Sequence, residues 1–144
     1  MADAAKVLVV ANRTAGSDEL LTALRDRAEQ GAVQFHLVVP ASPRGASWAF
    51  DMSAGQDAAE HDLEGALQRI RDLGLDIDGE VGDPDPVAAV SDASHAGDYD
   101  EVIVSTLPKH LSKWLKLDVA HKVAHTTGLP VKHVEAHSSD QASA

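Results

Sequence analysis

Five short apolar runs alternate with segments of helical periodicity, and this alternation restricts the possible fold more than any other feature of the sequence. The first run is continuous and rich in valine, which is typical of a strand buried on both faces of a sheet. The third run is interrupted by Gly79 and is the weakest of the five. The predicted strands cover residues 7–11, 33–39, 77–81, 101–104 and 130–134.

The segments between these runs carry helix signals. Leucine, isoleucine and alanine recur at helical spacing, and capping residues and glycines bound the periodic stretches. Side-chain caps are predicted at Ser17, Asp83 and Asp118, and helix stops at Gly31 and Gly128. The second helix is predicted over residues 57–73, and the last over residues 119–127.

Strands that alternate with helices are joined by right-handed crossovers and form a parallel sheet with helices on both faces. We therefore predict the α/β class, as a single doubly wound domain over residues 1–137 with a five-stranded parallel sheet and residues 7–11 at its centre. The polar tail, residues 138–144, is expected to be disordered. Ligands of such sheets bind beyond the carboxyl ends of the strands, where the strand order reverses.

A long loop is predicted between the second strand and the second helix. It runs from residue 40 to 56, which is long for a compact domain, and it contains Trp48 and Phe50. In one interpretation these rings fold back over the edge of the domain as a small apolar cluster. In the other they form a ligand lid or a subunit contact.

The net charge of −11 and the absence of cysteine exclude several classes of protein. Disulfide frameworks and cysteine metal sites need residues that the chain lacks. Binding to nucleic acid or to an anionic membrane needs clustered lysine and arginine, which an acidic chain does not offer overall. The apolar run at residues 7–11 is too short for a signal peptide or a membrane span. We predict a cytoplasmic protein with no nucleic-acid partner and no membrane partner.

Charge is distributed unevenly along the chain. Residues 72–101 contain ten acidic side chains and no lysine or arginine, whereas residues 109–132 contain five lysines and a single acid, Asp118. The first region repels anions, and the second can receive them. The alternative is that both regions are simply solvated surface.

Metal binding and catalysis find little support. His121 and His125 stand four apart, as on one helical face, but the glutamate of a zinc hydrolase motif and a third ligand are missing. His133 and His137 flank the fifth strand, and surface placement is predicted for all four. No Gly-x-Ser-x-Gly elbow or other nucleophile motif is present. We predict no metal, no catalytic residue and no enzyme activity, with weak nucleotide hydrolysis as the alternative.

Several stretches together resemble the universal stress protein family over nearly the whole chain. VLVVANRT (residues 7–14) is similar to the first strand of the family and the turn after it, and VGDP (81–84) to the step after its third strand. YDEVIVST (99–106), VAHKV (119–123) and LPV (129–131) resemble its fourth strand, last helix and last strand. The resemblance implies an α/β domain with a role in stress-related binding or regulation, and a homodimer.

The ATP loop of that family is replaced here. ATP-binding members have two glycines separated by two residues, then nine residues, then Gly-Ser or Gly-Thr. Alignment on the fourth strand places Ser105 and Pro108 at the two glycines and Asp118-Val119 at the final pair. Alignment on the last helix shifts that pair to residues 117–118 and restores no glycine. Proline removes a backbone N–H donor, and a carboxylate at a helix N-terminus repels phosphate.

The replacement segment, STLPKHLSKWLKLD (residues 105–118), allows three interpretations. It can be an amphipathic surface segment, a side-chain anion site, or an interface through its tryptophan. Asn12 stands where ATP-binding members have aspartate, so that contact loses its charge but keeps its hydrogen-bonding capacity. The ligand-binding candidates are Asn12, Thr14, Gly82, Ser105, Thr106, Lys109, His110, Lys113 and Asp118. The interface candidates are Trp48, Phe50, Trp114 and Val131.

The leading hypothesis is a universal-stress-protein-like binding or regulatory protein that has lost ordinary ATP binding and needs no cofactor. The alternatives are a domain that binds a nucleotide or another anionic metabolite through the lysine and histidine side chains of the altered loop, and a protein-interaction module. A homodimer is expected, with the fifth strand as an accessible edge.

Overall fold

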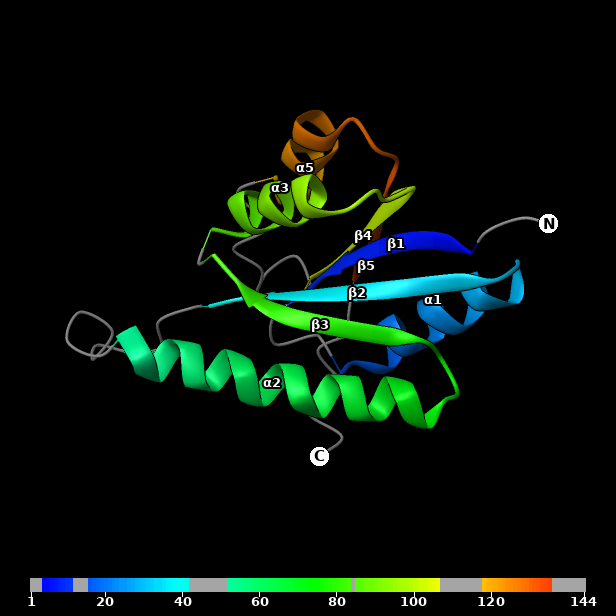
Figure 1. Ribbon diagram of the computed structural model, residues 1–144, viewed down its shortest axis with the longest axis horizontal. Coiled ribbons are helices and arrows are strands. Elements are labelled where there is room, and N and C mark those ends of the chain that lie inside the picture. Colours follow the sequence, from blue (N-terminus) through cyan, green and yellow to red (C-terminus); the bar gives the residue numbers. More distant parts are fainter. Residues whose placement is uncertain (1–3, 12–15, 42–51, 84, 107–117, 136–144) are drawn as a thin grey trace.

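The computed structural model describes residues 4–11, 16–41, 52–83, 85–106 and 118–135 (Figure 1). Five parallel strands form one sheet in the order β3-β2-β1-β4-β5, so the first strand lies at the centre. Their bounds are Ala5–Val10 for β1, Val33–Pro40 for β2, Ile77–Gly82 for β3, Glu101–Thr106 for β4 and Val131–Glu135 for β5. The predicted fold class and the central place of the first strand are confirmed.

Helices cover both faces of this sheet. The helices are α1 (Asp18–Glu29), α2 (Met52–Asp72), α3 (Pro86–Ala96) and α5 (Val119–Thr127). Figure 1 shows α3 and α5 above the sheet and α1 and α2 below it. Each pair of helices encloses its own hydrophobic core against the sheet.

The alternation of side chains along β1 separates the two cores. Val7 and Val9 belong to the core under α1 and α2, whereas Leu8 and Val10 belong to the core under α3 and α5. All four side chains are completely buried. Successive residues of a strand point to opposite faces, so an unbroken apolar run is required where both faces are covered.

Two helix ends are built as the sequence predicts. At the start of α1, the Ser17 hydroxyl accepts a hydrogen bond from the Leu20 N–H at 3.2 Å. At the end of α5, Gly128 has a φ of 71°, and its N–H donates to the Ala124 carbonyl at 2.9 Å. Glycine adopts this left-handed conformation without strain, so the helix ends there.

The start of α3 differs from the prediction. Its cap is Asp85, whose Oδ1 accepts from the Val87 N–H at 3.0 Å, and Pro86 occupies the first turn. Asp83 instead accepts from the Asp85 N–H at 2.9 Å, so its assignment as the cap was wrong. A residue before proline disfavours the helical conformation, and Asp85 is accordingly extended. The helix therefore cannot begin before Pro86.

The start of α2 also corrects the sequence analysis. The helix begins at Met52 and not at residue 57, so the predicted loop over residues 40–56 is too long. Gly55 lies inside this helix, and one glycine inside a helix costs only about 1 kcal/mol relative to alanine. No helix in the described part of the chain has the length and apolar character needed to cross a bilayer.

Candidate functional site

The order of the strands locates the candidate ligand site. From β1 the chain proceeds to β2 and β3 on one side of the sheet and to β4 and β5 on the other. The direction in which successive strands are added to the sheet therefore reverses between β1 and β4. Val10 of β1 pairs with Val104 of β4 near this point. Crevices that bind ligands in open parallel sheets lie beyond the carboxyl ends of two such strands. Ala11, Ser105 and Thr106 follow these pairs along the chain.

Two polar side chains are buried at the end of β4. Ser105 is completely buried, and Thr106 is 3% exposed. The Thr106 hydroxyl lies 2.7 Å from Nε2 of His133, which comes from β5. This bond satisfies a buried hydroxyl and links the last two strands near the candidate crevice. Apart from the position of His133 in the predicted fifth strand, no sequence pattern predicts this contact.

Asp118 occupies the N-terminal position of α5 in an unusual conformation. Its φ of 56° and ψ of 47° are left-handed, and no other non-glycine residue in the described part of the chain has a positive φ. Its side chain is exposed and makes no capping bond, whereas its carbonyl accepts from the Lys122 N–H at 3.1 Å. The predicted side-chain cap was therefore wrong.

The backbone explains the missing cap. Residues whose side chains cap a helix have an extended conformation, as Ser17 has with a ψ of 151° and Asp85 with a ψ of 116°. A left-handed Asp118 does not hold its carboxylate on the first amides of α5. The negative charge remains exposed at the positive end of the helix dipole.

Gly82 has a packing role at the end of β3. A Cβ atom at this position would lie 2.8 Å from Val38 Cγ1 and 2.9 Å from Ala89 Cβ. Its carbonyl accepts from the Ala41 N–H at 3.0 Å. Because β3 is two strands away from β1, Gly82 does not border the β1–β4 switch point.

The remaining predicted residues divide into two groups. Val131 is half-buried and packs against the core under α3 and α5. The other ligand and interface candidates lie outside the described residues: Asn12, Thr14, Lys109, His110, Lys113, Trp48, Phe50 and Trp114.

The histidines that suggested a metal site face solvent. His121 and His125 on α5 are both exposed. Over the described ranges, no three histidine, aspartate or glutamate side chains are grouped so that they could hold a metal ion. His137 lies outside these ranges.

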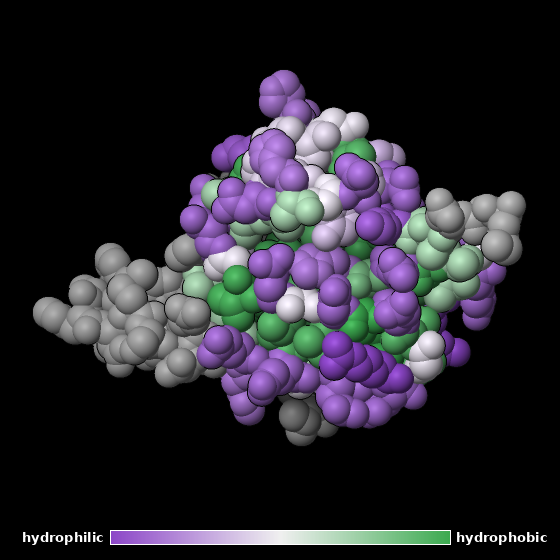
Figure 2. All heavy atoms as spheres, in the orientation of Figure 1, coloured by the Kyte–Doolittle hydropathy of each residue, from purple (hydrophilic) through white to green (hydrophobic). Residues whose placement is uncertain are grey.

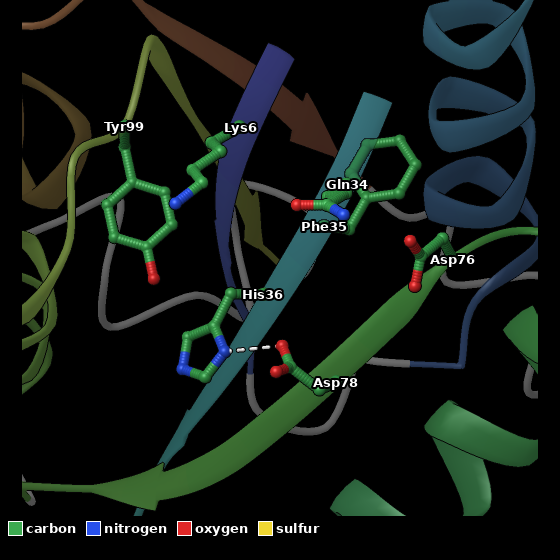
Figure 3. Close-up of a pocket in the computed structure, with 7 residues that line it drawn as sticks. All are labelled: Lys6, Gln34, Phe35, His36, Asp76, Asp78 and Tyr99. Carbon is green, nitrogen blue, oxygen red and sulfur yellow. Dashed lines mark hydrogen bonds and ion pairs between the residues drawn. The ribbon is translucent and has the colours of Figure 1, made fainter. Parts of the chain in front are cut away.

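A second polar cluster lies near the amino ends of the strands. A hollow of about 220 Å³ is lined by Lys6, Gln34, Phe35, His36, Asp76, Asp78 and Tyr99, which are drawn in Figure 3. Nδ1 of His36 lies 2.6 Å from Asp78 Oδ1, and its Nε2 lies 2.7 Å from Glu80 Oε2. The Tyr99 ring centroid is 6.2 Å from that of His36. The alternating acids at residues 76–80 were the available sequence signal for this cluster, and they were interpreted only as charge.

These contacts shift two pKa values. Burial opposes the charged ring of His36, but its hydrogen bonds to Asp78 and Glu80 and the charges of these carboxylates outweigh burial and raise its pKa above 6.5. Burial raises the pKa of Tyr99 above 10, and the same two carboxylates add to the effect. The cluster therefore favours a positively charged His36 that donates to both acids.

His36 should make stability depend on pH. Its pKa is higher in the folded state than the unfolded value of 6.5, so its contribution is fully present below pH 6.5 and is lost as pH rises through the folded pKa. We expect His36→Gln to reduce the free energy of unfolding more at pH 5.5 than at pH 8.5. Urea denaturation at several pH values measures this difference. His121→Gln, at an exposed position, is the control and should leave the pH profile unchanged.

Comparison with known proteins identifies the fold. No family model matches the sequence, and no curated protein matches it. Solved structures match over nearly their whole length. One is the universal stress protein from Archaeoglobus fulgidus in complex with dAMP, with a TM-score of 0.65, 17% identity, and coverage of 93% of this chain and 99% of that chain.

Two further structures agree with the first. A universal stress protein in complex with cAMP has a TM-score of 0.62 and 18% identity, and the match covers 94% of this chain and 99% of that chain. A family protein from Arabidopsis thaliana with AMP bound has a TM-score of 0.64 and 14% identity, and the match covers 94% of each chain.

The chain has the universal stress protein fold. At these identities the likeness concerns the arrangement of the strands and helices. The three proteins compared above are complexes with dAMP, cAMP and AMP.

Proposed function

We propose that this protein is a universal-stress-protein-like binding or regulatory domain that has lost ordinary ATP binding. The fold supports a ligand site at the carboxyl ends of β1 and β4, since the strand order reverses there. The observation that carries the loss of ATP binding is the left-handed, exposed Asp118 at the start of α5.

The conformation of Asp118 matches the position that it occupies in the alignment on the fourth strand. That alignment puts Asp118 at the glycine of the Gly-Ser pair, and its φ of 56° is one that glycine adopts most readily. At this one position the backbone has a conformation suited to glycine, although the residue is an aspartate. A carboxylate at this helix N-terminus repels the phosphates that the backbone amides would otherwise attract.

A second candidate function is the binding of a nucleoside monophosphate or another small anion. The three nucleotide complexes above contain dAMP, cAMP and AMP, each with a single phosphate. One phosphate needs fewer donors than a triphosphate chain. Lys109, His110 and Lys113 are the proposed side-chain donors, with Thr106 at the end of β4 adding a hydroxyl.

The regulatory role is proposed to involve a homodimer. Within the described ranges β5 pairs only with β4, so its outer edge is open for a second copy. A role in binding rather than catalysis is consistent with the lack of a nucleophile motif in the sequence.

Calorimetric titration with Mg-ATP and with AMP tests the proposal. We expect a dissociation constant for ATP of about 1 mM or weaker, which corresponds to about −4 kcal/mol or less favourable. Asp118→Asn removes the repelling charge and should tighten ATP binding. Asp118→Gly removes the charge and also suits the left-handed backbone, so it should tighten binding further, by about tenfold in all.

The control is Asp26→Asn, which removes one charge from an exposed position on α1. It should leave nucleotide affinity unchanged. Low-micromolar binding of Mg-ATP to the unaltered protein would contradict the loss of ATP binding. If AMP binds and Lys109→Ala and Lys113→Ala each weaken it in a salt-dependent way, the second candidate is supported.

A further inference from the structure

β3 is a terminal strand of the sheet, and its outer edge faces away from β2. Figure 1 views the molecule from this edge, with β3 in front of β2. In the described part of the chain, β3 pairs only with β2. The Asp76 and Gly82 carbonyls accept from the β2 side, so the N–H and C=O groups of the alternate residues face outward. Arg71 donates two hydrogen bonds to the outward-facing carbonyl of Ile77, from Nε at 3.1 Å and from Nη2 at 2.9 Å.

Apart from Ile77, two residues of β3 have backbone N–H and C=O groups that face outward along this edge. Gly79 and Val81 continue the same alternation beyond the carbonyl that Arg71 covers. Each offers one N–H donor and one C=O acceptor to an added strand. An open edge of this kind is a template for a further extended segment.

Carboxylates line the α3 side of this edge. Asp78 and Glu80 pair in register with His36 and Val38 of β2, and their side chains are 76% and 53% exposed. Asp76 stands two residues before Asp78, so it lies on the same face. The hollow of Figure 3 and a second hollow of about 250 Å³, bordered by Glu80, Asp83 and Asp92, lie on this side.

The α2 side of the same edge is apolar. Val81, Leu67 and Leu75 are partly buried and pack against the core under α1 and α2. In Figure 2, where this edge faces the reader, a band of green apolar atoms runs between purple hydrophilic groups. The edge therefore presents acids to one face of an added strand and apolar surface to the other.

We propose that the β3 edge binds an extended peptide segment of a partner protein in which basic and apolar residues alternate. The backbone of the segment pairs with Gly79 and Val81. Its lysine or arginine side chains lie over Asp76, Asp78 and Glu80, and its apolar side chains lie beside Val81 and Leu67. The period of two in the acids matches the period of side chains on a strand.

A second copy of this chain fits the edge poorly. Two β3 strands related by a twofold axis perpendicular to the sheet would continue the same face across the contact. The carboxylates of Asp78 and Glu80 would then meet their own copies, and like charges across neighbouring strands are destabilising. The charge of this edge favours a basic partner.

A pair of synthetic peptides tests the proposal. The first alternates lysine and valine over seven residues, and the second has the same composition with its lysines and valines in separate blocks. We expect the alternating peptide to bind the full chain about tenfold more tightly in fluorescence anisotropy at low salt. N-methylation of its backbone amides on the side that pairs should reduce binding by a similar factor, because the ladder bonds are lost.

Protein variants locate the binding site. Asp78→Asn with Glu80→Gln should weaken binding of the alternating peptide about tenfold. The matched control is Asp26→Asn with Glu29→Gln, which removes the same charges from exposed positions on α1 and should change binding less than twofold. Val81→Pro removes an outward N–H that β2 does not use, so it should weaken binding while the sheet remains intact.

Four results would overturn the proposal. Equal binding of the alternating and block peptides would show that charge alone attracts them. If the two double variants weakened peptide binding equally, the peptide would not bind at β3. Retained affinity of the N-methylated peptide would exclude strand addition, and this measurement does not depend on the folding of any variant. Loss of a homodimer in Val81→Pro, measured by sedimentation, would assign the edge to a second copy instead.

Discussion

Replacement of Leu24 by alanine is expected to lower the free energy of unfolding by about 3–4 kcal/mol. Leu24 lies on α1, is completely buried, and belongs to the core that α1 and α2 form with the sheet. Truncation removes the transfer free energy of the side chain and leaves a cavity that rigid strands cannot fill. Because domains of this kind are stable by only about 5–15 kcal/mol, urea denaturation should show a large shift of the midpoint.

The same substitution at Leu73 is the control. Leu73 follows α2 and is 41% exposed, so Leu73→Ala should change stability by less than about 1 kcal/mol. A loss at Leu73 as large as that at Leu24 would contradict the assignment of the core.

Gly79→Ala is expected to destabilise the protein for a different reason. A Cβ atom at this position would lie 2.7 Å from the Leu37 carbonyl oxygen and 2.7 Å from Leu63 Cδ1. The first of these atoms is backbone in the neighbouring strand, so β2 and β3 must separate to admit a methyl group. Overpacking of this kind costs about 1–3 kcal/mol, and thermal unfolding should occur several degrees lower.

Gly65→Ala is the matched control on α2. Nothing lies within 4 Å of a Cβ atom at this position, and the residue is exposed in a helix. Alanine is the better helix former by about 1 kcal/mol, so this variant should be slightly more stable than the unaltered protein. Equal destabilisation by the two substitutions would rule out the close approach at Gly79.

Most of the fold could be predicted because its signals are local. The run at residues 7–11 is apolar at every position, and only a strand covered on both faces requires this. Gly79, which made the third strand look weak, proved to be a site where α2 and β2 come too close for any side chain. Local pattern alone could not show this, because both neighbours are distant in the sequence.

The candidate site was less predictable. Asp118 was predicted to cap the last helix with its side chain, but no local pattern in the sequence shows that its backbone is left-handed. The His36 cluster was missed because it joins β2 to β3 across residues 36, 78 and 80. Residues 83–86 contain two Asp-Pro pairs, and each pair is a signal for the start of a helix. Only the extended conformation of Asp85, before Pro86, shows that the second pair begins α3.

The position of β1 at the centre of the sheet has a consequence for synthesis of the chain on the ribosome. Its partner β2 follows within about thirty residues, but β4 emerges only after α3 has been made. Until then, one edge of a strand whose last four residues are completely buried in the finished fold has no neighbour and is exposed to other nascent chains. The switch point between β1 and β4 is therefore completed late in translation, and a molecule whose synthesis stops before β4 lacks one side of the candidate site.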